Sequence, residues 1–200
     1  KYGYVPNAFA NGIIVPLLKG ADLDRTSIDN YRGITLSCVF SKIFECCLLS
    51  LFNEYLLSSE LQFGFKTGVG CRDAIFTARV AIDFLVDRGC TANVCALDLS
   101  KAFDKVDHYK LFLKLMSRNV PNCFLGIMVN WYTKCHAMVR WGGYLSAPFR
   151  VTAGVRQGGV LSPYLFAVYI DDLIIKLRTA GHGCQIIGFY LGCILYADDI

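Results

Sequence analysis

The chain has 200 residues, of which 54% are hydrophobic and 14% aromatic, and its formal net charge is +4. This composition excludes a disordered chain and allows one domain with a substantial core, or two lobes that share one. The mild positive charge suits a polyanionic partner without requiring one, because many ordinary domains carry as much.

Neither a membrane span nor a disulfide framework is expected. The longest uncharged run, residues 2–18, contains two prolines and two asparagines and is shorter than the about 18 to 20 apolar residues of a spanning helix. No secretory signal pattern is present at the N-terminus. The ten cysteines form no Cys-x-x-Cys motif, and the three histidines do not join them at zinc spacing. Because most of these cysteines lie in apolar runs, as Cys95 and Cys193 do, we expect reduced, packed thiols in an intracellular protein.

The first part of the chain predicts a strand followed by two helices. Residues 12–17 are typical of a short strand, and a polar loop follows over residues 19–30. Apolar residues recur at helical spacing between Val39 and Leu56, which predicts a helix there. A second helix is expected over residues 72–87.

The middle of the chain predicts a buried strand and a capped helix. Residues 94–97 are apolar and follow a turn-forming segment, so we expect a short buried strand that ends at Asp98. Asp107 has the character of an N-cap for a helix that ends near Arg118.

The last third predicts a hairpin, a turn and a helix. Residues 136–152 are typical of a β-hairpin that turns at the Gly142-Gly143 pair. A glycine-rich turn over residues 154–159 precedes a helix expected over residues 162–178. Because strands and helices are mixed without regular βαβ units, the predicted fold class is α+β.

Two Asp-Asp pairs receive different interpretations. Asp171 and Asp172 fall inside a predicted helix, where successive side chains point about 100° apart, so they cannot both face one metal ion. We interpret them as a solvated or locally paired helix face. Asp198 and Asp199 follow the apolar run at residues 186–195, which predicts a buried strand ending in a tight turn. Such a turn can bring both carboxylates to one side.

Asp98 is a candidate third carboxylate, because it ends another predicted strand. Unit negative charges about 4 Å apart repel by roughly 4 kcal/mol at an effective dielectric near 20, so such a cluster needs protons or cations. Oxygen ligands with open positions suit Mg²⁺, and two such ions about 3.5 to 4 Å apart support nucleotidyl transfer. The alternative is that all three aspartates are turn or capping residues, and spacing alone does not decide between the two.

Six ordered blocks resemble the reverse transcriptase domain of non-LTR (LINE-like) retrotransposons. They cover nearly the whole chain: residues 14–19, 30–36, 62–65, 97–104, 154–163 and 196–199. The resemblance implies a right-hand polymerase fold, truncated before the end of the palm and lacking the thumb. It places the fingers at residues 1–90 and the palm at residues 91–200. Within the palm range, an alternative assigns residues of about 119–135 to a helical fingers/palm insertion.

The resemblance also implies a set of metal ligands. Asp98 and Asp198 would hold two Mg²⁺ ions, for which Mn²⁺ is a substitute, the Leu99 carbonyl would add a ligand, and Asp199 would lie nearer the edge of the site. One ion would lower the pKa of the primer 3′-hydroxyl, while the other neutralises the departing pyrophosphate.

Five further positions match the family's nucleotide-binding residues. Lys19 and Arg32 would bind the incoming triphosphate. Without the resemblance, each would be interpreted as a solvated surface charge. Phe103 would exclude a ribose 2′-hydroxyl, and its alternative is a core phenylalanine. Gln157 and Gly158 would line the nucleotide and template pocket.

Two other blocks leave alternatives open, and one departs from the family. Residues 62–65 match a fingers segment near the template, although Phe63 and Phe65 are equally read as core residues. Arg156 fits either a phosphate contact or a surface position. Gly33 stands where the family usually has proline, so the loop that carries Arg32 is expected to be less rigid.

The resemblance implies an RNA-directed DNA polymerase that extends a DNA primer with dNTPs on an RNA template during retrotransposition. Such an enzyme is normally part of a larger polyprotein with an endonuclease, and it acts in a cytoplasmic ribonucleoprotein and in the nucleus. The alternatives are a catalytically inactive RNA-binding remnant and a group II intron-type maturase. We expect this piece alone to extend primers barely or not at all, because the return strand after Asp199 and the thumb are missing.

Overall fold

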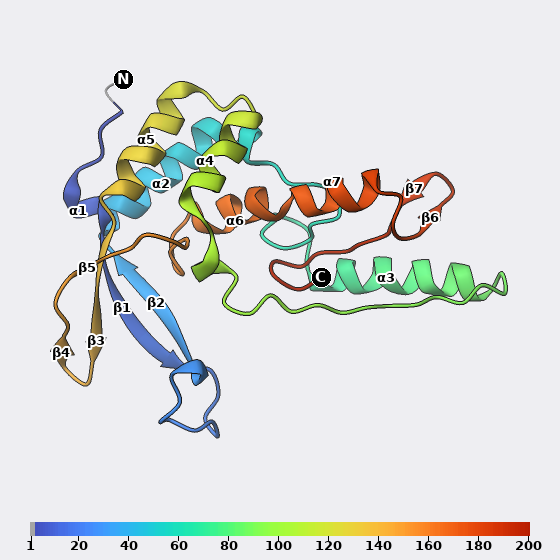
Figure 1. Cartoon of the computed structure of the whole chain (residues 1–200), viewed down its shortest axis with the longest axis horizontal. Coiled ribbons are helices and arrows are strands. Elements are labelled where there is room, and N and C mark those ends of the chain that lie inside the picture. Colours follow the sequence, from blue (N-terminus) through green and yellow to red (C-terminus); the bar gives the residue numbers. More distant parts are fainter. Residues whose placement is uncertain (1–2) are drawn as a thin grey trace.

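The computed structural model describes residues 3–200, and its main sheet is built on β1 (Asn11–Leu18). β1 pairs antiparallel with β2 (Tyr31–Ser37) and parallel with β3 (His136–Trp141). Figure 1 shows these strands projecting away from the helices. The predicted strand at residues 12–17 is confirmed, whereas β2 was not predicted as a strand.

The register between β1 and β2 brings two of the sequence blocks side by side. Leu17 lies opposite Arg32 and Leu18 opposite Tyr31, and the Lys19 N–H donates to the Asn30 carbonyl at 2.9 Å. The polar loop between the strands ends in a short 3-10 helix, η1 (Ile28–Asn30).

The predicted hairpin near residue 142 is confirmed. β3 turns at Gly142 and Gly143, which have φ of +52° and +89°, and returns as β4 (Tyr144–Leu145). β5 (Phe149–Arg150) then pairs with the beginning of β3.

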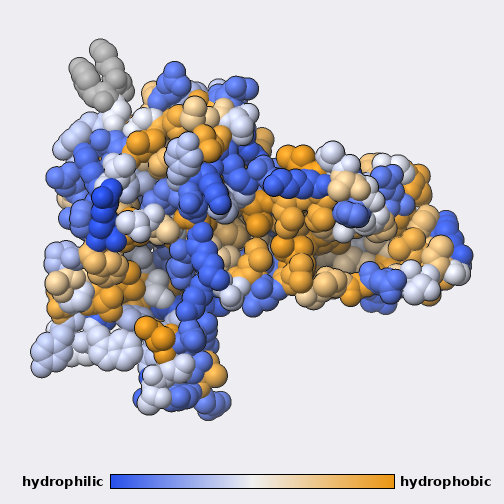
Figure 2. Space-filling model, viewed as in Figure 1, coloured by the Kyte–Doolittle hydropathy of each residue, from blue (hydrophilic) through white to orange (hydrophobic). Residues whose placement is uncertain are grey.

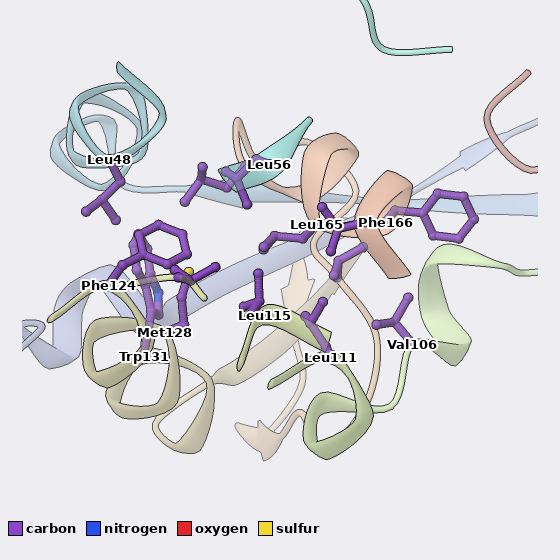
Figure 3. Close-up of a cluster of buried hydrophobic side chains, with 14 of the residues drawn as sticks. Leu48, Leu56, Val106, Leu111, Leu115, Phe124, Met128, Trp131, Leu165 and Phe166 are labelled. Atoms are coloured by element: carbon purple, nitrogen blue, oxygen red, sulfur yellow. The ribbon is translucent and has the colours of Figure 1, made fainter. Parts of the chain in front are cut away.

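Five helices pack together around one core. They are α1 (Asn7–Ala10), α2 (Val39–Phe52), α4 (His108–Ser117), α5 (Asn122–Thr133) and α6 (Ser162–Ile170). Their apolar faces meet at side chains that are almost wholly shielded from solvent (Figure 3): Leu48, Leu111, Leu115, Phe124, Met128, Trp131, Leu165 and Phe166. Full burial of one such side chain stabilises the fold by about 1.5 to 3 kcal/mol.

Two predicted helices of this bundle are confirmed. α2 continues into the 3-10 helix η2 (Asn53–Leu56), as the apolar spacing indicated. Asp107 caps α4, because its carboxylate accepts a hydrogen bond from the Lys110 N–H at 2.8 Å.

An arm extends from this bundle along α6 and α7 (Asp172–Thr179) toward a small hairpin of β6 (Gln185–Ile186) and β7 (Phe189–Tyr190) (Figure 1). The predicted helix at residues 162–178 is therefore two helices that meet at Asp171. α3 (Cys71–Val86), which confirms the second predicted helix, also lies in the arm.

The predicted buried strand at residues 186–195 is wrong. Ile187 and Gly188 have positive φ values of 50° and 80°, so the chain reverses there and the two halves pair as β6 and β7. Leu195 is nonetheless fully buried and packs in a second apolar cluster with Leu61 and Ile174.

The predicted buried strand at residues 94–97 is also wrong. Val94 is 73% exposed and Leu97 is 53% exposed, and Cys95 is exposed as well. A buried strand needs neighbours, but in the described chain this segment gains backbone partners only at its end, near Ile200. Figure 2 shows hydrophobic surface over the arm that carries this segment.

The cysteines are free thiols, but most are not buried as predicted. Among the described residues only Cys135 and Cys193 are buried, while Cys46 and Cys71 are among those that are exposed. Within residues 3–200, no helix has both the length and the apolar character to cross a membrane.

Candidate active site

A tight turn at residues 196–199 carries the C-terminal Asp-Asp pair. The Tyr196 N–H donates to the Asp199 carbonyl at 2.9 Å, and the Asp199 N–H donates to the Tyr196 carbonyl at 3.1 Å. Ala197 has a φ of +58°, the left-handed conformation typical of two-residue hairpin turns. The predicted tight turn is therefore confirmed.

Asp98 lies beside this turn, although about a hundred residues separate them in the sequence. Leu97 and Ile200 exchange backbone hydrogen bonds of 2.7 and 2.9 Å, and Asp98 stands opposite Asp199 in antiparallel pairing. Directly opposed residues of an antiparallel pair project their side chains to the same face. The structure thus brings Asp98 to the Asp-Asp turn.

The donor chemistry of this site fits a divalent cation. The carboxylates of Asp98 and Asp199 are exposed and that of Asp198 is half-buried, and the ion pairs among the described residues use other carboxylates. Carboxylate oxygens in a water-accessible position are ligands that Mg²⁺ accepts. However, in the described part of the chain no three acidic, histidine or cysteine side chains lie close enough together to hold a metal ion.

The loop after Asp98 contains a tight turn and an ion pair to the β1–β2 loop. The Leu99 carbonyl, a predicted ligand, accepts the Ala102 N–H at 3.2 Å, which leaves its second lone pair free. The Lys101 ammonium lies 2.6 Å from the Asp29 carboxylate, and this contact lowers the pKa of Asp29 and raises that of Lys101. The ion pair links the β1–β2 loop to the loop that carries Asp98.

Phe103 packs between two other aromatic rings. Its ring stacks on Phe166 with centroids 4.7 Å apart and meets the edge of Phe65 at 5.8 Å. Phe103 is half-buried and lies at the border of the main core. The core packing is therefore observed, while its role against the sugar stays a prediction.

Lys19 and Arg32 both belong to the β1–β2 hairpin. The Lys19 ammonium donates to the Asp29 carbonyl at 2.8 Å, so it already has one partner, and Arg32 is exposed. Their predicted contact with a triphosphate stays a prediction.

Gln157 and Gly158 dock against β2. The Thr35 N–H donates to the Gln157 carbonyl at 2.8 Å, and the Gln157 amide donates to Asp104 at 3.1 Å. Gly158 has a φ of +111°, and a Cβ there would lie 3.0 Å from the Thr35 carbonyl, so both conformation and space favour glycine. Gln157 and Thr35 line a cavity of about 240 Å³.

Arg156 is half-buried and not a simple surface residue, while its alternative role, a phosphate contact, stays a prediction. Its guanidinium donates to the backbone carbonyls of Phe9, at 2.8 Å, and of Ala10 at the end of α1. It also lies over the Trp131 ring, with its central carbon 5.7 Å from the ring centroid. Arg156 therefore joins the glycine-rich turn to the helical core.

The upstream Asp-Asp pair is engaged in ion pairs. Asp171 lies 2.6 Å from the Arg118 guanidinium and Asp172 lies 2.9 Å from the Lys114 ammonium. The local pairing that we predicted is confirmed, but Asp171 is buried and not solvated. The pair therefore holds helices together.

Sequence reasoning missed Gln62, which is fully buried beside the Asp-Asp turn. Its side chain hydrogen-bonds the backbone of Ala197 at 2.9 and 3.2 Å, and the Phe63 N–H donates to the Leu195 carbonyl at 2.7 Å. The block at residues 62–65 thus contacts the turn. The available signal was a glutamine within an otherwise apolar block.

Comparisons with known proteins identify the family of the chain. The family described as "Reverse transcriptase (RNA-dependent DNA polymerase)" matches residues 19–200. The chain is 30% identical over 174 residues to the "Probable RNA-directed DNA polymerase from transposon X-element" of Drosophila melanogaster, covering 85% of this chain and 19% of that protein. It is also 30% identical over 210 residues to the "RNA-directed DNA polymerase from mobile element jockey" of Drosophila funebris, covering 100% of this chain and 22% of that protein. The chain therefore spans about a fifth of the length of these relatives.

A solved structure shows the same fold. Apo telomerase from Candida tropicalis, truncated from its C-terminal domain, has a TM-score of 0.56 and 13% identity, covering 88% of this chain and 40% of that one. The predicted α+β, right-hand polymerase fold is confirmed by this likeness together with the family match. The chain belongs to the reverse transcriptase (RNA-dependent DNA polymerase) family, and its relatives are proteins of non-LTR retrotransposons.

Proposed function

We propose that the chain forms the fingers and palm of an RNA-directed DNA polymerase, which extends a DNA 3′-hydroxyl with dNTPs on an RNA template. One observation carries this proposal: Asp98 stands opposite Asp199, in a turn that also presents Asp198. Backbone pairing alone does not require aspartates at these positions, whereas Mg²⁺ is typically bound through one or two carboxylates together with substrate phosphates.

Asp98, Asp198, Asp199 and the Leu99 carbonyl would hold Mg²⁺, or Mn²⁺ in its place. The bound ions would supply Lewis-acid activation of the primer hydroxyl and neutralise charge on the pyrophosphate. The chain's own contribution would be to hold these oxygens near one another, and the backbone pairing of Leu97 with Ile200 supports this because it keeps Asp98 beside the turn.

The nucleotide would lie against residues on both sides of the site. Lys19 and Arg32 would grip its triphosphate, because cationic side chains bind phosphate oxygens strongly. Phe103 would pack against the sugar and select deoxyribose. Gln157 and Gly158 would line the pocket, because glycine permits close backbone approach.

We also propose that the chain works within a larger retrotransposon polyprotein with an endonuclease, since its relatives are about five times longer. Residues 1–90 would form the fingers and residues 91–200 the palm. Its partners would be an RNA template and a DNA primer. It would act in a cytoplasmic ribonucleoprotein and in the nucleus.

The test is primer extension by the full-length protein with an RNA template, dNTPs and Mg²⁺. Asp98→Asn or Asp198→Asn should lower kcat by more than ~100-fold, since even outer partners of metal ligands are worth 10 to 100-fold. Asp172→Asn, which removes a carboxylate on α7, should leave kcat close to wild type. The reverse pattern would move the active site to the upstream pair. A protein that binds RNA but never extends a primer would instead be an inactive remnant.

A further inference from the structure

The side chain of Gln62 makes an unusually complete set of contacts with the Asp-Asp turn. Its Oε1 accepts the Ala197 N–H at 2.9 Å and the Gly64 N–H at 2.9 Å, while its Nε2 donates to the Ala197 carbonyl at 3.2 Å. Gln62 has no solvent exposure. One buried amide therefore satisfies both backbone polar groups of the residue that precedes Asp198.

These bonds act on the part of the turn that cannot satisfy itself. The backbone bonds that close the turn join Tyr196 and Asp199, so the polar groups of Ala197 need another partner. Ala197 also holds a φ of +58°, which a residue with a Cβ adopts only when its surroundings impose it. Gln62 supplies that constraint.

Gly64 completes the fit of this segment to the turn. A Cβ at Gly64 would lie 2.4 Å from the Ala197 nitrogen and 3.1 Å from the Gln62 Oε1. Gly64 does not have a positive φ, so its backbone conformation is open to alanine. Close approach to the catalytic turn is therefore what requires glycine here.

The Gln62 segment, residues 59–64, is itself anchored at both ends. The Ser59 N–H donates to the buried Asp171 carboxylate at 2.7 Å, and Asp171 pairs with Arg118 at 2.6 Å. On the other side of Gln62, the Phe63 N–H donates to the Leu195 carbonyl at 2.7 Å. A segment held in this way can transmit a fixed position to the turn.

We propose that Gln62, together with Gly64, is a positioning element that fixes the orientation of the Asp198-Asp199 turn for catalysis. The proposal rests on the proposed function, because it assigns the metal-binding role to that turn. Loss of the hydrogen bonds of the Gln62 side chain should misplace Asp198 and Asp199 without weakening the binding of template and primer. Small misplacements of such groups lower the rate of the chemical step.

The test compares Gln62→Met and Gly64→Ala with wild type in the full-length protein. Methionine is similar in length to glutamine but cannot reproduce its hydrogen bonds. Each variant should lower kcat by roughly 10- to 100-fold, the range found when outer partners of metal ligands are lost. KM for the template and primer should stay close to wild type. Glu60→Gln is the matched control and should keep kcat close to wild type, because the Glu60 side chain is 73% exposed and its carboxylate contacts Arg178 and Ser59 rather than the turn.

A second measurement examines the contact itself, independently of catalysis. In Gln62→Met, the Ala197 N–H should exchange with solvent at least ~10-fold faster than in wild type, because its buried acceptor is gone. A kcat equal to wild type, or an unchanged exchange rate, would overturn the proposal. Unfolding of both variants would also overturn it, since the two residues would then serve stability alone.

Parallel measurement of Asp198→Asn separates the two proposals. If Asp198→Asn extends primers as wild type does, the proposed active site fails, whereas the exchange rate of Ala197 still reports on Gln62. If Asp198→Asn is inactive and Gln62→Met has normal kcat, only the positioning role fails.

Discussion

The buried carboxylate of Asp171 lies 2.6 Å from the guanidinium of Arg118, and this ion pair joins the end of α6 to the end of α4. The Arg118 guanidinium also donates to the Leu57 carbonyl. Asp171 in turn accepts the Ser59 N–H at 2.7 Å. One carboxylate therefore anchors two helices and the segment that leads to Gln62.

Asp171→Ala should strongly destabilise the fold. Removal of one partner of a buried ion pair typically costs about 3 to 5 kcal/mol, because the other charge is left uncompensated. Asp172→Ala is the matched control: its side chain is 48% exposed, so its pair with Lys114 should contribute only about 0 to 1 kcal/mol. Urea unfolding of both variants measures the difference. Equal stabilities would contradict the assignment of Asp171 as an anchor.

Helices were largely predictable from the sequence, since their apolar spacing reports local periodicity. The helix over Val39–Phe52 and the N-cap at Asp107 depend on residues close in sequence, and both were found. The strands at residues 94–97 and 186–195 failed for a different reason. Apolar runs do not say which partner they meet, and the second run reverses at Ile187.

The candidate site shows the same division. Asp198 and Asp199 could be separated from Asp171 and Asp172, because a helix and a tight turn orient adjacent side chains differently. The buried contact of Gln62 with Ala197 spans 135 residues, so no local pattern reveals it. The burial of Asp171 likewise depends on Arg118, which lies 53 residues away in the sequence.

Gly126→Ala should stabilise the protein. Gly126 lies within α5, and a Cβ there would meet no other atom within 4 Å. Alanine in a helix interior is favoured over glycine by about 0.5 to 1 kcal/mol. Gly183→Ala provides the contrast, because a Cβ there would lie 2.2 Å from the Gly192 Cα, at a φ of +96°. Thermal unfolding should show a higher midpoint for the first variant and a lower one for the second.

Tyr190 should make the arm sensitive to alkaline pH. Burial, followed by the neighbouring Cys193, raises the pKa of Tyr190 to about 12. The unfolded chain releases this proton near pH 10. The contribution of Tyr190 to the free energy of unfolding is therefore fully present below pH 10 and is lost as the pH rises toward 12.

Urea unfolding between pH 9 and pH 12 tests this, over a range set by those two pKa values. Tyr190→Phe should lose less stability than wild type as the pH rises. Tyr144→Phe, at a residue that is 82% exposed, is the control and should behave as wild type does. A Tyr190→Phe curve parallel to that of wild type would contradict the prediction.

Phe103→Val should admit ribonucleotides in the full-length protein. If the ring excludes the 2′-hydroxyl, a smaller side chain removes the clash, and discrimination against ribonucleotides should fall by roughly 10- to 100-fold, the usual range for a pocket contact of this size. The ratio of kcat/KM for dNTP and rNTP measures this change. Unchanged discrimination would leave Phe103 as a core residue only.

The stacking of Phe103 on Phe166 requires a control that separates packing from sugar selection. Phe166→Leu removes the stacked partner, whose side chain is almost wholly buried, and should cost about 1 to 2 kcal/mol of stability. Because Phe103 itself remains, sugar discrimination in this variant should stay close to wild type. A matching loss of discrimination in Phe166→Leu would mean that the position of the Phe103 ring, set by the core, determines selection. Phe103→Tyr retains the ring and should keep discrimination in either case.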